Sequence, residues 1–425
     1  MTINSLRLIF VALYFLLSAF TAANAGFKGE IDLTGSHSRN AGNSLDAALG
    51  EQNHWDQDLI VRLMWSTDLG DGWRLDAAYL AEARHGGGVA LTRRRRAIDP
   101  LDAVNPSETT LMNLDHTFID DDQTHVAHRI DRLALGYSSS HLVLRLGRQA
   151  LTWGGGLVFH PMDLFNPFPP NATYTAYKPG ADMLYSQWLF DSGADLQGVV
   201  VPRRDPDTGD VAADQSSAGI KWKTFFGRDR QLGLDLLLCQ DYRAQVLGIG
   251  LSGPLGGAAW TTEVVPTRLD DGDVRTTFLA NVQYAWSWRD KSVNGYLEYF
   301  HNGIGVGGTE PALIDLPIPL AERLARGELF TVSRNYLAAG LDLQWTPLLD
   351  LKPVIISNLD DGSALFFGQA IYSLSQNTSL TFGVQWALGR DGSEYGGLRT
   401  EPGSGTFATP ADLIYTRFTW YLAHF

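Results

Sequence analysis

Charged side chains set between apolar ones are the residues of this 425-residue chain with the clearest chemical potential. Six basic positions precede three acidic ones along the chain, with one acidic exception near the start: Arg62, Arg74, Arg132, Arg145, Lys221 and Lys223, then Asp235, Glu298 and Asp342, with Asp76 as the exception. On facing walls of a water-filled pore, such charges would create a transverse field that orients dipolar solutes. The same charges could instead pair across neighbouring strands and only keep the interior wet. The sequence leaves both interpretations open.

A glycine- and proline-rich segment is the second candidate site. Its distinctive residues are Arg148, Gln149, Trp153, Gly154, Asp163, Asn166 and Pro167. Three glycines beside a tryptophan allow a close-packed backbone, and four prolines stiffen the return of the chain. Because long loops in compact folds are commonly functional, we predict that residues 151–182 fold into the mouth of a pore as a constriction. The alternative is a surface loop ordered by its prolines.

Two polar clusters invite other chemistry. Arg93–Arg96 could grip lipopolysaccharide phosphates or gather anionic solutes, although a solvated charge run is the simpler interpretation. Asp120–Asp122, followed by His125 and His128, lacks the turn glycine and the terminal glutamate of a calcium loop. The two histidines could share a metal only on a helical turn. We therefore expect no metal site, and no cofactor is implied.

Strands are the elements that must position these residues. In Ser379–Leu388, apolar side chains occupy every second position, from Leu380 to Leu388, and small or polar ones lie between them. This period of two is typical of a strand with one apolar face. The same alternation recurs in five further segments: 59–65, 142–146, 232–238, 278–286 and 337–345.

Three features favour a transmembrane barrel over a soluble sandwich. Tryptophans gather near strand ends, as in interfacial girdles. The strands run about ten residues, long enough to cross a membrane at a tilt, whereas sandwich strands average five or six. Short linkers also alternate with long ones.

We predict an all-β, antiparallel up-and-down barrel of about 18 strands, with 16 as the alternative because the linkers near 241–242 and 360–362 are short. The expected strands are 27–35, 57–67, 73–83, 128–138, 141–150, 183–191, 194–203, 216–226, 231–240, 243–252, 257–265, 275–287, 293–301, 335–346, 351–359, 363–373, 377–388 and 413–425.

Composition and the N-terminus narrow the class further. Charged residues make up 19% of the chain, below the usual 25% of soluble proteins, and hydrophobic residues make up 44%. The net charge of −14 argues against wrapping nucleic acid, and a single cysteine excludes a disulfide scaffold. Met1–Ala25 has a basic start, an apolar run and an Ala-Asn-Ala cleavage site, the pattern of a secretory signal peptide. We expect residues 26–425 to form one transmembrane β-barrel domain, with short periplasmic turns and long extracellular loops.

One motif carries a family resemblance. The pattern R-Q-x-L-x-W-G at Arg148–Gly154, followed by D-x-x-N-P at Asp163–Pro167, resembles poorly characterised Gram-negative outer-membrane barrels that are grouped loosely as porin-like or export-associated. The last strand, which ends at Phe425, resembles the assembly signal of such barrels, although Phe425 is out of register with the apolar face. The resemblance covers the barrel architecture as a whole, but its motif spans only about 25 residues. It implies transport without naming a solute.

The expected function is passive passage of small polar or charged solutes through the outer membrane. The expected partners are the lipid bilayer and lipopolysaccharide, not nucleic acid. The sequence does not decide whether the protein forms a homotrimer or binds an envelope partner. A non-conducting or gated scaffold of an export system is the alternative. A surface-exposed barrel hydrolase is a weaker one, because neither His54 with Asp56 nor His85 has a visible nucleophile. We therefore do not expect an enzyme.

Overall fold

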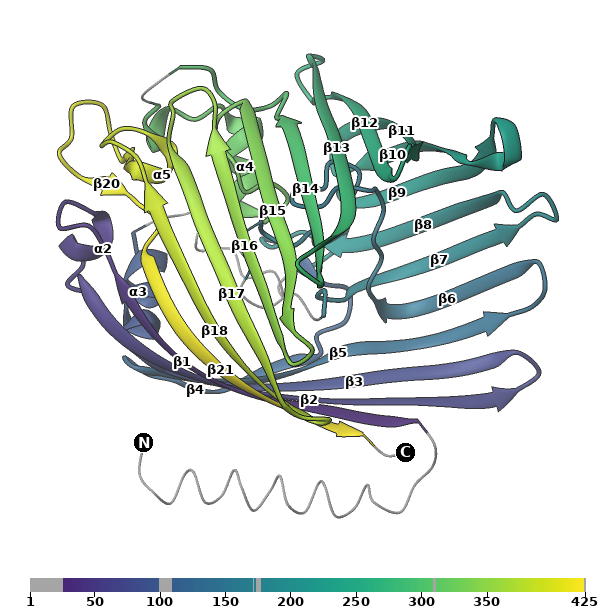
Figure 1. Ribbon diagram of the computed structural model, residues 1–425, viewed down its shortest axis with the longest axis horizontal. Coiled ribbons are helices and arrows are strands. Elements are labelled where there is room, and N and C mark those ends of the chain that lie inside the picture. The colour runs from purple at the N-terminus through teal and green to yellow at the C-terminus, as the bar shows by residue number, and fades with distance from the viewer. Residues whose placement is uncertain (1–25, 99–108, 171, 173–176, 309–310, 424–425) are drawn as a thin grey trace.

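Eighteen antiparallel strands form one closed barrel (Figure 1). The computed structural model describes residues 26–98, 109–170, 172, 177–308 and 311–423, so the expected signal peptide and Phe425 lie outside the described residues. Successive barrel strands pair with each other, and β21 pairs with both β18 and β1 to close the wall. The barrel strands are β1 (Phe27–Arg39), β2 (Asn53–Gly70), β3 (Trp73–Gly86), β5 (Thr124–Ser138), β6 (Leu142–Gln149), β7 (Ala181–Leu189), β8 (Asp195–Arg204), β9 (Val211–Phe226), β10 (Leu232–Asp241), β11 (Ala244–Leu255), β12 (Ala258–Arg268), β13 (Val274–Trp288), β14 (Lys291–His301), β15 (Asn335–Thr346), β16 (Leu349–Asn358), β17 (Ala364–Ser375), β18 (Thr378–Leu388) and β21 (Asp412–Ala423).

The predicted barrel and its count of 18 strands are confirmed, and the count of 16 is wrong. The short linkers at 242–243 and 359–363 are tight turns at the end of the barrel that otherwise carries the long loops. Several strands extend beyond their predicted bounds, as β2 does on both sides of 57–67. Backbone pairing with β1 and β3 continues there after the apolar alternation stops, because ladder hydrogen bonds do not require apolar side chains.

The alternating residues divide between the two faces of the wall as expected. Large apolar side chains such as Leu146, Leu238 and Leu388 are exposed on the outer face, by 62%, 57% and 53%. Aromatic side chains pair across strands on that face, as Phe366 and Trp386 do at 5.7 Å between ring centres. An exposed apolar belt around a closed sheet is the surface that a membrane barrel presents to lipid.

One short strand was not predicted. β4 (Asp115–Asp120) pairs with residues 125–129 of β5, where β6 does not reach, because β6 pairs with β5 only from Leu133 to Ser138. Without β4, this edge of β5 would present unpaired backbone groups beside the gap that β6 leaves when it ends at Gln149.

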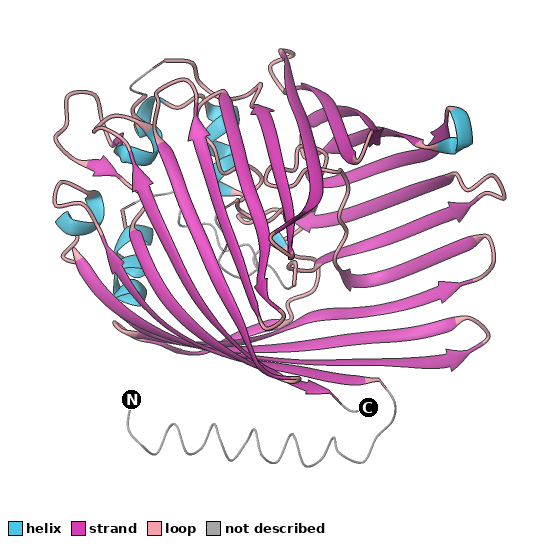
Figure 2. Ribbon diagram, in the orientation of Figure 1, coloured by secondary structure: helices cyan, strands magenta, loops and turns pink. Residues whose placement is uncertain are grey.

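In the part of the chain that the structure describes, helices occur only in the connections between strands (Figure 2). Among the described residues, no helix is both long enough and apolar enough to cross a membrane. The four adjacent arginines lie in α3, and α4 lies in the connection between β14 and β15. The helical elements are α2 (Leu45–Ala48), α3 (Gly87–Arg96), α4 (Ile318–Ala325) and α5 (Glu394–Gly397), with single turns η2 (Arg228–Arg230) and η3 (Leu313–Asp315); β19 (Leu398–Arg399) and β20 (Phe407–Ala408) form a separate small hairpin.

Candidate functional site

The connection between β6 and β7 lies inside the barrel. Trp153 is 2% exposed, and it packs with Met162 and Phe165 against buried side chains of the wall: Met183, Val199, Val201, Leu237, Cys239, Val246 and Val265. The indole Nε1 of Trp153 donates a hydrogen bond to Oε1 of Gln197 on β8, at 2.6 Å. The name inner loop is used for the described residues within 150–180, which are 150–170, 172 and 177–180.

Glu298 on β14 holds the inner loop through its backbone. One carboxylate oxygen accepts hydrogen bonds from the amides of Val158 and Phe159, at 2.9 and 2.8 Å. The other accepts from the amide of Leu157 at 2.7 Å and from Nδ2 of Asn281 at 3.0 Å. Because Glu298 is fully buried, these four donors replace the water that its charge would otherwise require.

Glycines allow the inner loop to approach the wall. Gly154 has φ +95°, and a Cβ there would lie 3.0 Å from a carboxylate oxygen of Glu263 on β12. On β11, a Cβ at Gly248 would lie 3.0 Å from the terminal methyl of Met162, which is fully buried in the inner loop. The G-x-G-x-x-G pattern that begins at Gly248 therefore leaves space for the side chain of Met162. It is followed by β12 and not by a nucleotide-binding helix.

Lys178, near the end of the inner loop, contacts both the middle and the start of that loop. Nζ of Lys178 lies 2.6 and 2.7 Å from the carboxylate oxygens of Asp163, and it also donates to the carbonyl oxygen of Leu151. Burial raises the pKa of Asp163 and lowers the pKa of Lys178, and the contact between the opposite charges acts against both shifts. Asp163 belongs to the predicted constriction motif, whereas no motif marked Lys178.

The other residues of the motif have different positions. Arg148 forms an ion pair with Asp182 on β7, at 2.8 Å, and its guanidinium also donates to the carbonyl oxygen of Met112 before β4. It thereby joins β6, β7 and the connection that precedes β4, and it lines neither of the cavities described below. Gln149 donates to the carbonyl oxygen of Met183 at 3.4 Å and is likewise part of the wall. Asn166 is exposed, with its amide 3.4 Å from the carbonyl oxygen of Pro179, whereas Pro167 lines a cavity.

Local pairing dominates the inward charges. Arg62 and Arg132 both contact Asp131, at 2.9 and 2.7 Å, and Asp131 is 2% exposed. The alternation predicted Arg132 as inward and gave Asp131 no role. A β-bulge opposite Ala78 and Tyr79 shifts the register there and turns Asp131 toward Arg62.

The remaining inward charges divide into paired and unpaired positions. Lys221 contacts Asp235 at 3.3 Å. Within the described part of the chain, Arg145 and Lys223 have no carboxylate within ion-pair distance, although Lys223 lies between Asp195 and Asp235 in the register. Two further pairs of inward charges lie near the short turns, Arg74 with Asp76 at 3.1 Å and Asp342 with Lys352 at the same distance. Only a few of these inward positions therefore carry the unpaired charges that a basic wall facing an acidic wall would require.

The side chains of the Arg93–Arg96 run and of the Asp120–His128 segment form contacts with neighbouring loops and strands. Arg95 pairs with Asp46 in α2, and Arg93 donates to the carbonyl oxygen of Asp120. His125 lies 3.5 Å from Asp120, but the neighbouring His128 faces the other side of the sheet and stacks on Phe118. The described residues include no group of three side chains able to hold a metal ion. His54 lies 3.4 Å from Asp56, beside α3.

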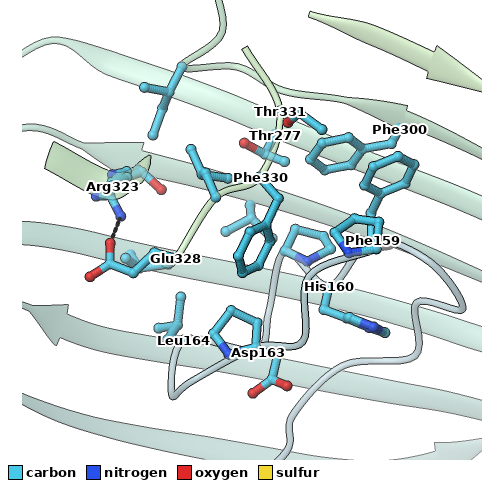
Figure 3. Close-up of a pocket in the computed structure, with 18 of the residues that line it drawn as sticks. Phe159, His160, Asp163, Leu164, Thr277, Phe300, Arg323, Glu328, Phe330 and Thr331 are labelled. Atoms are coloured by element: carbon cyan, nitrogen blue, oxygen red, sulfur yellow. Dashed lines mark hydrogen bonds and ion pairs between the residues drawn. The ribbon is translucent and has the colours of Figure 1, made fainter. Parts of the chain in front are cut away.

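Two cavities open at the end of the barrel that carries the long loops. The first, which we call the aromatic cavity, has an empty volume of about 760 Å³ and lies between the inner loop, β10–β14 and the connection from β14 to β15. Figure 3 shows Phe330 between the Arg323–Glu328 ion pair on one side and Phe159 on the other. The second, the polar cavity, has an empty volume of about 1400 Å³. Its lining includes Asn40, Asp46, His54, Arg95, Gln385 and Glu394.

The β14–β15 connection is fixed on both sides of Phe330. Before it, Glu328 pairs with Arg323 and Arg326, at 3.1 and 2.7 Å, and the guanidinium of Arg326 lies over the ring of Tyr242. After it, Glu394 in α5 accepts hydrogen bonds from the backbone amides of residues 332 and 333, at 2.8 and 3.1 Å. Burial raises the pKa of Glu394. No sequence motif marked these residues.

Comparisons with known proteins concern the fold. No family model matches the chain, and no curated protein matches it either. Among solved structures, it is similar to OccK9 (OpdG) of Pseudomonas aeruginosa, with a TM-score of 0.54 and 10% identity over 93% of this chain and 98% of that one. It is also similar to OccK5 (OpdH) of Pseudomonas aeruginosa, with a TM-score of 0.50 and 9% identity over 94% of this chain and 99% of that one. The likeness is that of the closed antiparallel 18-stranded barrel of outer-membrane porins.

Proposed function

We propose that the protein is an outer-membrane channel for passive passage of small polar or charged solutes, exported by a cleaved signal peptide. The observation that carries the proposal is the contrast between the two faces of the wall. Its outer face is apolar, whereas inward positions near the short turns carry water-exposed charges: the side chains of Arg74, Asp342 and Lys352 are 53%, 51% and 43% exposed. A wide barrel with a wet interior leaves an aqueous path unless loops fill it.

The inner loop supplies the constriction in this proposal. It is held by buried carboxylates and an apolar cluster on the wall, so it narrows the path without depending on a partner. Arg145 and Lys223 would set a preference for anions, because their charges are not cancelled by an ion pair within the described residues. The proposal includes contact with lipid and lipopolysaccharide and excludes catalysis.

The test is single-channel conductance of the refolded mature protein in a planar bilayer under a KCl gradient. Steady conductance supports the channel, and replacing Arg145 and Lys223 together with glutamine should shift the reversal potential toward cation preference. Arg243→Gln is the matched control, because Arg243 lies in the β10–β11 turn, where it pairs with Asp270 on the surface. Silence from a heat-modifiable, folded barrel would refute the open channel and favour the non-conducting scaffold.

A further inference from the structure

We propose that Phe330 and Pro170 form the selective step of the solute path, and that this step favours small solutes with an apolar ring beside hydrogen-bonding groups over hydrated ions. This inference rests on the proposed channel function and adds the class of solute and the residue that selects it.

Phe330 lies on the boundary between the two cavities. Among the described residues that line the two cavities, only Phe330 and Pro170 line both. A solute that moves from the polar cavity to the aromatic cavity therefore passes these two rings. They come from different connections, Pro170 from the inner loop and Phe330 from the segment between β14 and β15.

The aromatic cavity offers rings and hydroxyl groups. Phe159, Phe168 and Phe300 line it together with Phe330, and the prolines of the inner loop add further apolar surface. Thr267, Thr277 and Thr331 place hydroxyl-bearing side chains on the same lining. Apolar walls with a few polar groups are typical of sites for small organic molecules.

Charges in this lining are already satisfied. Asp163 contacts Lys178 at 2.6 Å, and Glu328 contacts Arg323 at 3.1 Å. The third carboxylate, that of Asp241, is 1% exposed and accepts a hydrogen bond from the hydroxyl of Ser217 at 2.6 Å, so it is hardly accessible to a solute. A hydrated ion that enters loses water at the two rings without gaining an uncompensated opposite charge, whereas an apolar ring gains contact area.

The two ends of the connection keep Phe330 in place. The ion pairs of Glu328 fix the chain two residues before it, and Glu394 binds the backbone two and three residues after it. A half-buried ring between two such anchors is positioned by the fold. It is therefore a defined obstacle, and shortening it should widen the passage without removing a barrel contact.

The experiment compares wild type, Phe330→Ala and the control Phe118→Ala in bilayers and liposomes. Phe118 is 60% exposed on β4 and lines neither cavity. The readouts are KCl conductance and the swelling rates of liposomes in methyl β-glucoside and in phenyl β-glucoside, which differ only in the apolar group. Heat-modifiable migration reports barrel formation for each variant.

A pore that selects by size alone should admit the larger phenyl β-glucoside more slowly than methyl β-glucoside. We expect the phenyl-to-methyl ratio of swelling rates in wild type to exceed the ratio that this size difference predicts. Phe330→Ala should raise KCl conductance about twofold or more and abolish the phenyl preference, whereas Phe118→Ala should change neither. A wild type that admits phenyl β-glucoside but conducts little KCl, beside a conducting Phe330→Ala, would also support the selective step.

Other outcomes separate the two hypotheses. Equal conductance and equal glucoside ratios in wild type and Phe330→Ala would overturn the selective step while leaving the channel intact. A folded wild type and variant that admit neither ions nor glucosides would overturn the channel itself. If Phe330→Ala does not form the barrel, Phe330→Leu, which keeps an apolar but shorter side chain, carries the same expectation to a smaller degree.

Discussion

The attachment of the inner loop to Glu298 can be tested by changing one atom. Glu298→Gln keeps the shape of the side chain but replaces one carboxylate oxygen with an NH₂ group. Each oxygen now accepts two hydrogen bonds, one from Val158 and Phe159 and the other from Leu157 and Asn281. In either orientation of the amide, the new NH₂ group therefore faces two donors, and two of the four hydrogen bonds are lost.

The free-energy cost of Glu298→Gln follows from the burial and charge of Glu298. A hydrogen bond to a charged group contributes about 1.5–3 kcal/mol, so the loss of two costs about 3–6 kcal/mol. Glu298 is fully buried, so solvent does not screen the loss. The ratio of attached to detached loop backbone should fall by a factor of about 10²–10⁴, because 1.4 kcal/mol corresponds to a tenfold change.

Hydrogen–deuterium exchange measures this change directly, because the amides of residues 157–159 are the donors. Their exchange should accelerate at least about a hundredfold in Glu298→Gln, with the barrel strands unaffected. Glu322→Gln is the control, since Glu322 is half exposed on α4 and its ion pair is with Arg326. Exchange of 157–159 that stays within tenfold of wild type, in a folded barrel, would refute the anchoring role.

Three further changes test the seat of the inner loop and the loops above it. Trp153→Ala should cost about 3–5 kcal/mol and allow a maleimide to label Cys239, which is 2% exposed in the same cluster; continued resistance to labelling would contradict this packing. Gly248→Leu places a Cβ 3.0 Å from Met162, so thermal unfolding should show a loss of about 1–3 kcal/mol; unchanged stability would mean that the loop shifts freely. Burial raises the pKa of Glu394 above its ordinary 4.5, so its proton stabilises the folded loops fully below about pH 4.5, and this contribution is lost as pH rises through the raised pKa. Exchange of 389–411, corrected for intrinsic rates, should therefore be slower at pH 5 than at pH 8 in wild type, and Glu394→Gln should lack the difference.

The wall could be predicted from the sequence because its strands obey one rule. Each strand faces lipid on one side and the interior on the other, so residues such as Leu380, Phe382 and Trp386 alternate with small or polar ones. That alternation predicted the strands and their outward face, whereas the count of about 18 also depended on linker lengths and left 16 as an alternative. It failed at the bulge beside Asp131, because the sequence does not mark where a strand gains an extra residue.

The contents of the barrel were less predictable. The sequence marked Trp153, Gly154 and Asp163 through their unusual composition. It could not pair Asp163 with Lys178 or Leu157 with Glu298, because those contacts depend on how the loop returns through the interior. Phe330 is an ordinary residue in a mixed segment, and only the meeting of two distant connections gives it a distinct position.

The contact between Glu298 and the inner loop also bears on the order of folding. Glu298 lies 141 residues along the chain from Leu157 and 139 from Phe159. Contacts between such distant residues form late, because the chain must first lose the entropy of a very long intervening loop. The growing wall therefore encloses an unattached inner loop until β12–β14 are in place. Assembly should accordingly pass through a wide, leaky barrel before the interior is filled, and slow docking of the inner loop would be the last step toward the mature form.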